Sequence, residues 1–301
     1  LPIFHTHGLF VAINVCLIAG SKIILVPRFN SDELINNIPK ATVLMGVPTF
    51  YTRLLSNDSF NNKLCEKMRL FISGSAPLLA ETHIDFEKRT GHKILERYGM
   101  TETNMSTSNP YNAERRAGTV GFPLPGIELK ITDPKTGIEL PRGEIGNLEV
   151  RGPNVFVGYW NMPEKTKEEL REDGFFITGD LGLMDEDGYV QIIGRDKDLI
   201  ISGGFNIYPK ELELLLDEQE GVIESAVIGV PHPDFGETPL GILVREKSAE
   251  PKIDKIEKII KSQLARYKHP KRFIVIDELP RNTMGKVQKN LLRDQYRDTF
   301  L

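Results

Sequence analysis

The sequence predicts an α/β fold: a mostly parallel sheet with helices, then an antiparallel β region, then a small α+β domain. Three observations support this prediction. Residues 1–97 alternate helical and strand patterns, which favours right-handed crossovers between parallel strands. Short strands divided by turn signals fill residues 118–195, and helices and strands alternate again from about residue 196.

The first part begins with the apolar run 8–20, which Asn14 interrupts. It is shorter than the roughly 20 residues that cross a bilayer, so we expect a core helix over 8–19 and no membrane span. The following patterns predict strands at 22–26, 41–47, 69–73 and 92–96, and helices at 31–38, from Pro48, and at 77–90. Ligands bind beyond the carboxyl ends of such strands, here at 26–29, 46–49, 73–77 and 98–102.

The second part predicts a hairpin between 174–180 and 188–195, because DEDG at 185–188 is a strong turn signal. Beyond it we expect helices at 208–217 and 253–267, and strands at 225–230, 240–246 and 272–276. The expected domains are 1–195, divided into an α/β part (1–117) and a β-rich part (118–195), and 196–301. The charged and then glycine-rich junction 194–206 is typical of a hinge.

Composition excludes several classes of function. The 301 residues carry a net charge of −4, which gives no electrostatic reason to expect nucleic acid or an anionic membrane. Cys16 and Cys65 lack metal or redox spacing, which indicates a reducing compartment. The chain has no signal peptide and no initiator Met. We therefore expect an internal fragment of a cytoplasmic protein, or of an organelle-matrix protein if a targeting segment precedes it.

The stretch YGMTE (98–102) carries more chemistry than a turn requires. A threonine hydroxyl can hold a phosphate oxygen, Glu102 can hold Mg²⁺, which prefers oxygen ligands, and Tyr98 can stack on a base. The alternative is a helix that begins at Thr101 with a capping hydroxyl. The stretch alone does not separate the two.

Three charged positions near turns have two interpretations each. Asp180 ends TGD and Arg195 ends the next strand, so both can reach one sugar, although Gly-Asp is also common turn chemistry and an arginine there can be a surface ion pair. Lys286 closes PRNTMGK. It is either a solvated charge or a cation presented to phosphate during transfer.

Two further candidates lie near the start of the chain. His5 and His7 are two residues apart, so on a strand they share a face, as a metal pair or, more simply, as packing or pocket-lining residues. No third ligand follows at metal spacing. Arg28 ends the predicted strand at the ligand-binding edge, where it either clamps a carboxylate or lies on the surface.

Taken in order, SGSAP (73–77), ERYGMTE (96–102), TGD (178–180), GRDKDLIISGG (194–204) and PRNTMGK (280–286) resemble the AMP-forming acyl-CoA synthetases, the adenylate-forming enzymes. The resemblance spans nearly the whole chain. Within that family, LPIFHTHGLF, ATVLMGVPTFYTRLL and ERYGMTETNMSTSNPY are most similar to malonyl-CoA synthetases. It implies a ligase of fatty acid metabolism that uses ATP, Mg²⁺ and coenzyme A, with an acyl-adenylate intermediate.

The resemblance also implies roles for residues. It assigns nucleotide binding to Gly74, Ser75, Ala76, Glu96, Arg97, Tyr98, Gly99, Thr101, Asp180 and Arg195, and the metal to Glu102. It assigns the acyl and CoA passage to His5, His7 and Met100, the hinge to Lys197, the pantetheine tunnel to Ser202, Gly203 and Gly204, and catalysis to Lys286, Thr101 and Glu102. We add Arg28 for the distal carboxylate of malonate, because a dicarboxylate requires a cation in its pocket.

One departure from the family concerns its Ser/Thr/Gly-rich phosphate loop, which lies upstream of FHTHG and is absent from this sequence. We therefore expect a C-terminal part of the large domain plus the small mobile domain, and poor or no adenylation by these residues alone. Three hypotheses remain: a malonate–CoA ligase, a ligase for a fatty or aryl acid, and an inactive module that binds a nucleotide or CoA.

Overall fold

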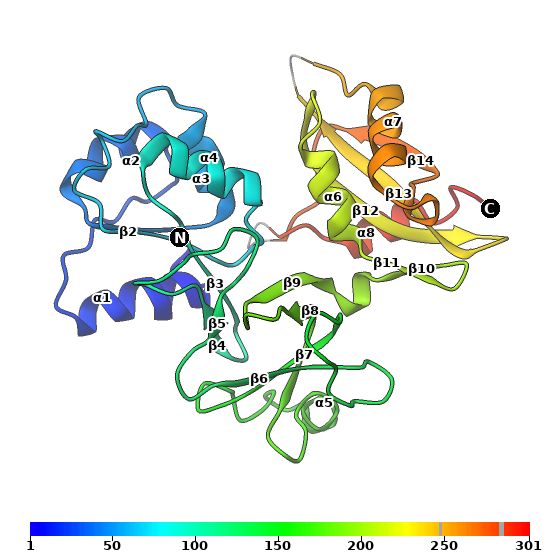
Figure 1. The fold of residues 1–301 in the computed structure, drawn as a ribbon, viewed down its shortest axis with the longest axis horizontal. Coiled ribbons are helices and arrows are strands. Elements are labelled where there is room, and N and C mark those ends of the chain that lie inside the picture. Colours follow the sequence, from blue (N-terminus) through cyan, green and yellow to red (C-terminus); the bar gives the residue numbers. More distant parts are fainter. Residues whose placement is uncertain (247–248, 283–285) are drawn as a thin grey trace. The chain divides into compact units, whose positions relative to one another are not determined.

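A computed structural model describes residues 1–246, 249–282 and 286–301. The chain divides into two compact units (Figure 1). The first unit contains residues 1–178 and 182–192, and the second contains 179–181 and 193–301. The predicted fold class is confirmed in both: parallel and antiparallel strands with helices in the first, and an α+β arrangement in the second.

The first unit is built on a mixed five-stranded sheet. Its strands, in spatial order, are β1 (Val43–Gly46), β2 (Leu70–Ser73), β3 (Leu95–Met100), β4 (Asn104–Ser108) and β5 (Phe122–Pro123). The strands β1, β2 and β3 are parallel, whereas β4 and β5 run antiparallel to their neighbours. The carboxyl ends of β1, β2 and β3 therefore meet at one edge, as predicted.

Three helices cover one face of this sheet (Figure 1): α2 (Ser31–Asn37), α3 (Pro48–Leu55) and α4 (Ala80–Thr90). Their core contains Tyr51, Phe71 and Phe86, none of which is exposed. The helix α2 begins after Asn30, whose side chain accepts a hydrogen bond from the Glu33 N–H at 2.9 Å, as an N-cap does. A short turn, η2 (Ile38–Lys40), follows it.

Two predictions for the start of the chain are wrong. The apolar run does form a helix, as η1 (His7–Asn14) and α1 (Val15–Ile18), but it is not a core helix, since most of its apolar side chains are exposed, Ile18 by 89%. The expected strand at 22–26 is irregular and mostly exposed. A β-branched run makes a strand only where a neighbour pairs with it, and no described strand does so here.

The β-rich part forms a four-stranded sheet in the order β6 (Glu128–Thr132), β7 (Gly146–Arg151), β8 (Phe176–Met184) and β9 (Val190–Arg195). The predicted hairpin is confirmed: β8 and β9 are neighbours, and Asp185 Oδ1 accepts the Tyr189 N–H at 2.8 Å in the turn. A short helix, α5 (Pro163–Glu169), lies between β7 and β8 in the sequence.

The second unit has a sheet in the order β11 (Phe205–Ile207), β10 (Ile200–Ser202), β13 (Gly236–Arg245) and β12 (Val222–His232), with β14 (Arg272–Ile276) parallel to β13. Its helices are α6 (Pro209–Asp217), α7 (Ile253–Gln263) and α8 (Lys289–Gln295), with short turns η3 (Asp196–Asp198) and η4 (Arg266–Lys268). Over the described ranges, no helix combines the length and the apolar character that crossing a membrane demands.

The turn between β3 and β4 depends on Gly99. A Cβ atom there would lie 1.8 Å from the Asn104 carbonyl oxygen, far closer than any side chain tolerates, so only glycine fits. The strand β3 extends to Met100, and residues 101–103 form the turn into β4. The alternative of a helix that begins at Thr101 is therefore wrong.

Glu96 on β3 shows how burial changes the pKa of a carboxyl group on this strand. It is 4% exposed, and burial raises the pKa of its carboxyl group from 4.5 to about 8. The folded state therefore binds a proton that the unfolded state releases between these pH values, so the free energy of unfolding falls as pH rises from 4.5 to 8.

We expect Glu96→Gln to remove this dependence, because glutamine resembles the protonated acid. The gain in stability relative to wild type, on the order of 4 kcal/mol, should appear at about pH 8 and vanish near pH 4.5. Urea unfolding at several pH values measures it. Glu66→Gln, at an exposed position, is the control, and equal pH profiles for wild type and Glu96→Gln would contradict the expectation.

Candidate active site

Three predicted segments, distant in sequence, meet at the carboxyl edge of β2 and β3. The His7 Nδ1 atom is 3.0 Å from the Ser75 hydroxyl oxygen. The Thr6 hydroxyl lies 3.4 Å from that of Thr101, across 95 residues of chain. Residues 5–7, 73–76 and 97–102 thus form one site within the first unit.

The loop after β2 is strained at this site. Ser75 has a φ of +70°, a conformation that costs a non-glycine residue about 1–3 kcal/mol. Its neighbour Gly74 is buried, and a Cβ atom there would lie 3.3 Å from the His7 ring. Ser75 and Ala76 are exposed. The loop thus presents its small side chains at the edge where ligands bind in such sheets.

His7 is buried and electrically neutral. Burial, reinforced by His5 and Arg97, lowers the pKa of its imidazole to about 4. The backbone N–H of His7 donates to the His5 ring at 3.2 Å, and the two residues lie at the start of η1 rather than on a strand. Where residues are described, no three His, Cys, Asp or Glu side chains group as metal ligands. The two histidines are therefore better suited to lining a pocket.

Arg97 is a half-buried cation beside these residues. It follows Leu95 by two positions on β3, so both side chains lie on the same sheet face. Burial lowers the pKa of its guanidinium, yet its Nε atom has no hydrogen-bond partner, and no carboxylate pairs with it among the described residues. A buried positive charge without a counter-ion is costly and favours an anionic ligand.

The end of β3 and the turn that follows it carry the other predicted residues. Tyr98 packs against the core that includes Val120. Met100 is partly buried and pairs with Asn104, whereas Thr101 is exposed. Glu102 is partly buried. Its carboxylate and the Thr101 hydroxyl supply hard oxygen donors, so these two residues fit Mg²⁺.

The sequence did not predict a loop that supports this turn. The Phe156 N–H donates to the Glu102 carbonyl at 2.8 Å. The Tyr159 hydroxyl lies 3.2 Å from Glu102 Oε1 and 2.6 Å from Glu169 Oε2. Next to it, Trp160 is 89% exposed. The only local signal was the aromatic pair in GYWN at 158–161.

In the second unit, Asp180 and Arg195 lie together. Asp180 is 4% exposed, and its Oδ1 atom is 2.8 Å from Arg195 Nε. The two residues thus form an ion pair between β8 and β9, which was the alternative interpretation for Arg195, and their binding of a sugar stays a prediction.

The other predicted site residues of this unit lie in turns or at the end of a strand. Lys197 is exposed on η3. Ser202 is buried, and Gly203 and Gly204 form the two-residue turn between β10 and β11, with φ of +55° and +84°. Lys286 is exposed and its N–H donates to Asn282 Oδ1 at 3.0 Å. Residues 283–285 of its motif lie outside the described residues.

Arg28 is exposed in the irregular segment that follows η1 and α1. The strand that was expected to position it does not form, so the reason for placing it at the sheet edge is wrong. Its role stays a prediction.

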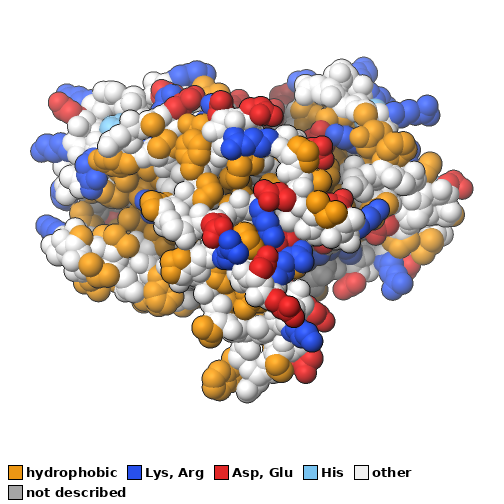
Figure 2. Space-filling view, turned by 60° about the horizontal axis from the view of Figure 1, so that its bottom comes forward, with side chains coloured by type: hydrophobic (Ala, Val, Ile, Leu, Met, Phe, Trp, Pro, Cys, Tyr) orange, Lys and Arg blue, Asp and Glu red, His pale blue; other side chains and the backbone are white. Residues whose placement is uncertain are grey.

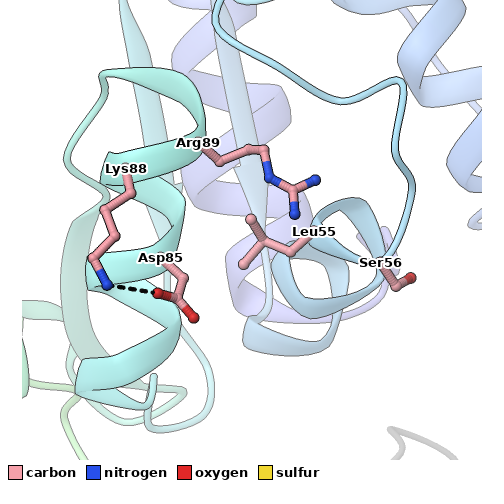
Figure 3. A pocket seen from close by; sticks show the side chains of 5 residues that line it. All are labelled: Leu55, Ser56, Asp85, Lys88 and Arg89. Carbon is pink, nitrogen blue, oxygen red and sulfur yellow. Dashed lines mark hydrogen bonds and ion pairs between the residues drawn. The ribbon is translucent and has the colours of Figure 1, made fainter.

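A large hollow lies elsewhere, between α3 and α4 (Figure 3). It is a shallow, open hollow of about 720 Å³, lined by Leu55, Ser56, Asp85, Lys88 and Arg89. It contains none of the predicted site residues, and Asp85 already pairs with Lys88 at 3.1 Å. On the face drawn in Figure 2, cationic and anionic side chains are interspersed. Neither feature is a better candidate for the functional site than the group of residues at the sheet edge.

Comparison with known proteins yields two family matches. The model described as "AMP-binding enzyme" matches residues 1–160, and that described as "AMP-binding enzyme C-terminal domain" matches residues 211–286. A malonate–CoA ligase from Arabidopsis thaliana is 39% identical over 97% of this chain and 53% of its own length. A long-chain-fatty-acid–CoA ligase from Bacillus subtilis is 38% identical over 98% of this chain and 53% of its own.

Solved structures agree. The ATP-bound crystal structure of MatB from Rhodopseudomonas palustris matches with a TM-score of 0.95 and 59% identity, over 100% of this chain and 60% of that one. The o-succinylbenzoate–CoA synthetase of Bacillus subtilis with its acyl-adenylate matches at 0.89 and 32% identity, over 98% and 60%. The chain spans about half the length of the curated relatives it matches. The first family model covers more than half of the chain, and the motifs of the sequence predicted the same family. The chain therefore belongs to the AMP-binding enzymes, among the AMP-forming acyl-CoA synthetases.

Proposed function

We propose that the protein containing this chain is an acid–thiol ligase that forms malonyl-CoA from malonate, ATP and coenzyme A. The observation that carries this proposal is the meeting of residues 5–7, 73–76 and 97–102 at one sheet edge. A malonate carboxylate attacks the α-phosphorus of ATP, and pyrophosphate leaves. The thiol of coenzyme A then attacks the acyl carbon of the malonyl-adenylate, and AMP leaves.

Several of the site residues have a proposed role in this scheme. Tyr98 stacks on adenine beside Gly74, Ser75 and Ala76. Asp180 accepts hydrogen bonds from the ribose hydroxyl groups. When bound, Mg²⁺ neutralises phosphate charge, and Glu102 and Thr101 are the residues that would hold it. Lys286 stabilises charge that develops at the α-phosphate.

The proposed domains are 1–195 and a mobile 196–301, in a cytoplasmic protein. Lys197 acts as hinge between them, and Ser202 with its two glycines faces pantetheine. The neutral His7 lines the acyl passage without binding the acid as an ion pair.

A second candidate is a ligase for another acid, favoured by the similarity to fatty-acid–CoA ligases. A third is a module that binds nucleotide or CoA without turnover. Malonate is preferred over a fatty acid because the half-buried Arg97, which pairs with no carboxylate among the described residues, suits a second carboxylate, whereas a fatty chain requires apolar walls.

Pyrophosphate exchange tests the proposed reaction. With protein expressed from its complete reading frame, malonate should support ATP–pyrophosphate exchange, and acetate or octanoate should support it poorly. Lys286→Ala should reduce exchange by about 100-fold because transition-state charge loses its cation. Lys258→Ala, at an exposed position on α7, is the control. Exchange with octanoate alone supports the second candidate, and nucleotide binding without exchange supports the third.

The next prediction separates the two candidate cations for malonate. Arg97→Met should lower the ratio of malonate to acetate turnover by about tenfold or more, since a half-buried guanidinium is screened less than an exposed one. Arg28→Ala should change this ratio less. Measurement of kcat/KM for both acids decides between them. If only Arg28→Ala alters the ratio, Arg28 is the cation, as first assigned.

A further inference from the structure

The Tyr159 hydroxyl lies between two carboxylates. It is 3.2 Å from Glu102 Oε1 and 2.6 Å from Glu169 Oε2. A phenol has one proton and donates to one acceptor at a time. The shorter distance indicates that the phenol donates its hydrogen bond to Glu169 in the present structure. Glu102 is a second acceptor within reach.

A phenol is protonated near neutral pH, since its ordinary pKa is about 10. The two neighbouring carboxylates place negative charge around it. Lys165 offsets part of the negative charge, because its ammonium lies 3.7 Å from Glu169 Oε1 and 4.8 Å from the centre of the Tyr159 ring. The cluster of Glu102, Tyr159, Lys165 and Glu169 therefore carries a formal net charge of −1, and Lys165 lies beside Glu169 and the Tyr159 ring.

The tyrosine is itself held in place. Its backbone N–H donates to the Thr166 hydroxyl at 2.9 Å, and its ring packs edge-on against Phe156 at 4.8 Å. The same loop binds the backbone of the turn that carries Glu102. Asn154 donates to the Thr103 carbonyl at 2.7 Å, and the Phe156 N–H donates to that of Glu102 at 2.8 Å. Tyr159 and Glu102 are thus fixed relative to each other.

We propose that Tyr159 is a positioning residue that orients the Glu102 carboxylate toward the nucleotide-bound divalent cation. With the cation bound, the Tyr159 hydroxyl turns its proton from Glu169 to Glu102 Oε1, which leaves Oε2 for the cation. Glu169, the nearer acceptor in the present structure, keeps the phenol at this position. The inference rests on the proposed use of MgATP. Mutation of a residue that hydrogen-bonds to a metal ligand typically lowers the affinity for the metal by 10–100-fold.

The test compares ATP binding with and without the cation. Isothermal titration of Tyr159→Phe should show MgATP binding weakened about tenfold, with binding of ATP in excess EDTA changed less than about twofold. Tyr111→Phe, which alters a partly exposed tyrosine paired with Arg69, is the matched control. Glu169→Gln should retain MgATP binding, because the phenol then donates to Glu102.

A double-mutant cycle with Glu102→Gln supplies the second measurement. If Tyr159 acts through Glu102, Tyr159→Phe should add no further loss of MgATP affinity in that background. Equal losses for MgATP and metal-free ATP, or an undiminished effect in the Glu102→Gln background, would overturn the proposal in favour of a general structural role. If wild type binds MgATP and supports exchange while Tyr159→Phe is unchanged, this inference fails alone. If wild type does neither, the proposed function fails with it.

Discussion

The close approach of Gly99 to the main chain of Asn104 is the constraint on which the candidate site depends. A side chain at position 99 would collide with the Asn104 carbonyl. Because glycine has none, β3 and β4 can be joined by a turn of only three residues. That turn carries Thr101 and Glu102 and extends the strand that carries Arg97 and Tyr98. A looser turn would separate the hydroxyl and carboxylate groups from the loop after β2, which His7 contacts.

Burial determines which groups at this edge carry charge. The pKa of His7 is lowered and that of Glu96 is raised, so both tend toward their neutral forms near neutral pH. Arg97 keeps its charge, since even a lowered guanidinium pKa leaves it protonated. The buried part of the site is thus positive, whereas the cluster around Tyr159 is negative. An anionic acid and a cation-bound phosphate have complementary places in this distribution.

Local pattern predicted much of the fold and failed where a partner decides the outcome. Helices such as α2 and α4, and the hairpin of β8 and β9, follow from periodicity, caps and turn residues that act over a few positions. The run at 22–26 has strand propensity, yet no described strand pairs with it. The helix that begins at His7 is apolar, yet packing covers only His7, Gly8 and Val11.

The site shows the same division. Motifs predicted which segments carry chemistry, and the parallel strands explained why they meet. The contact of Tyr159 with Glu102 joins residues 57 apart through a loop without periodicity, so no local signal reveals it. Likewise, the partial burial of Arg97 with no carboxylate paired to it in the described part of the chain depends on neighbours from several segments.

The loop that supports Glu102 also contains a spectroscopic reporter. Trp160 is the chain's single tryptophan, directly follows Tyr159 and is 89% exposed to solvent. Selectively excited tryptophan emission from this chain therefore originates at one position, one residue from the phenol that contacts Glu102. Its intensity and its quenching by small solutes report the local state of the loop without any introduced label, and signals from the rest of the fold do not obscure them.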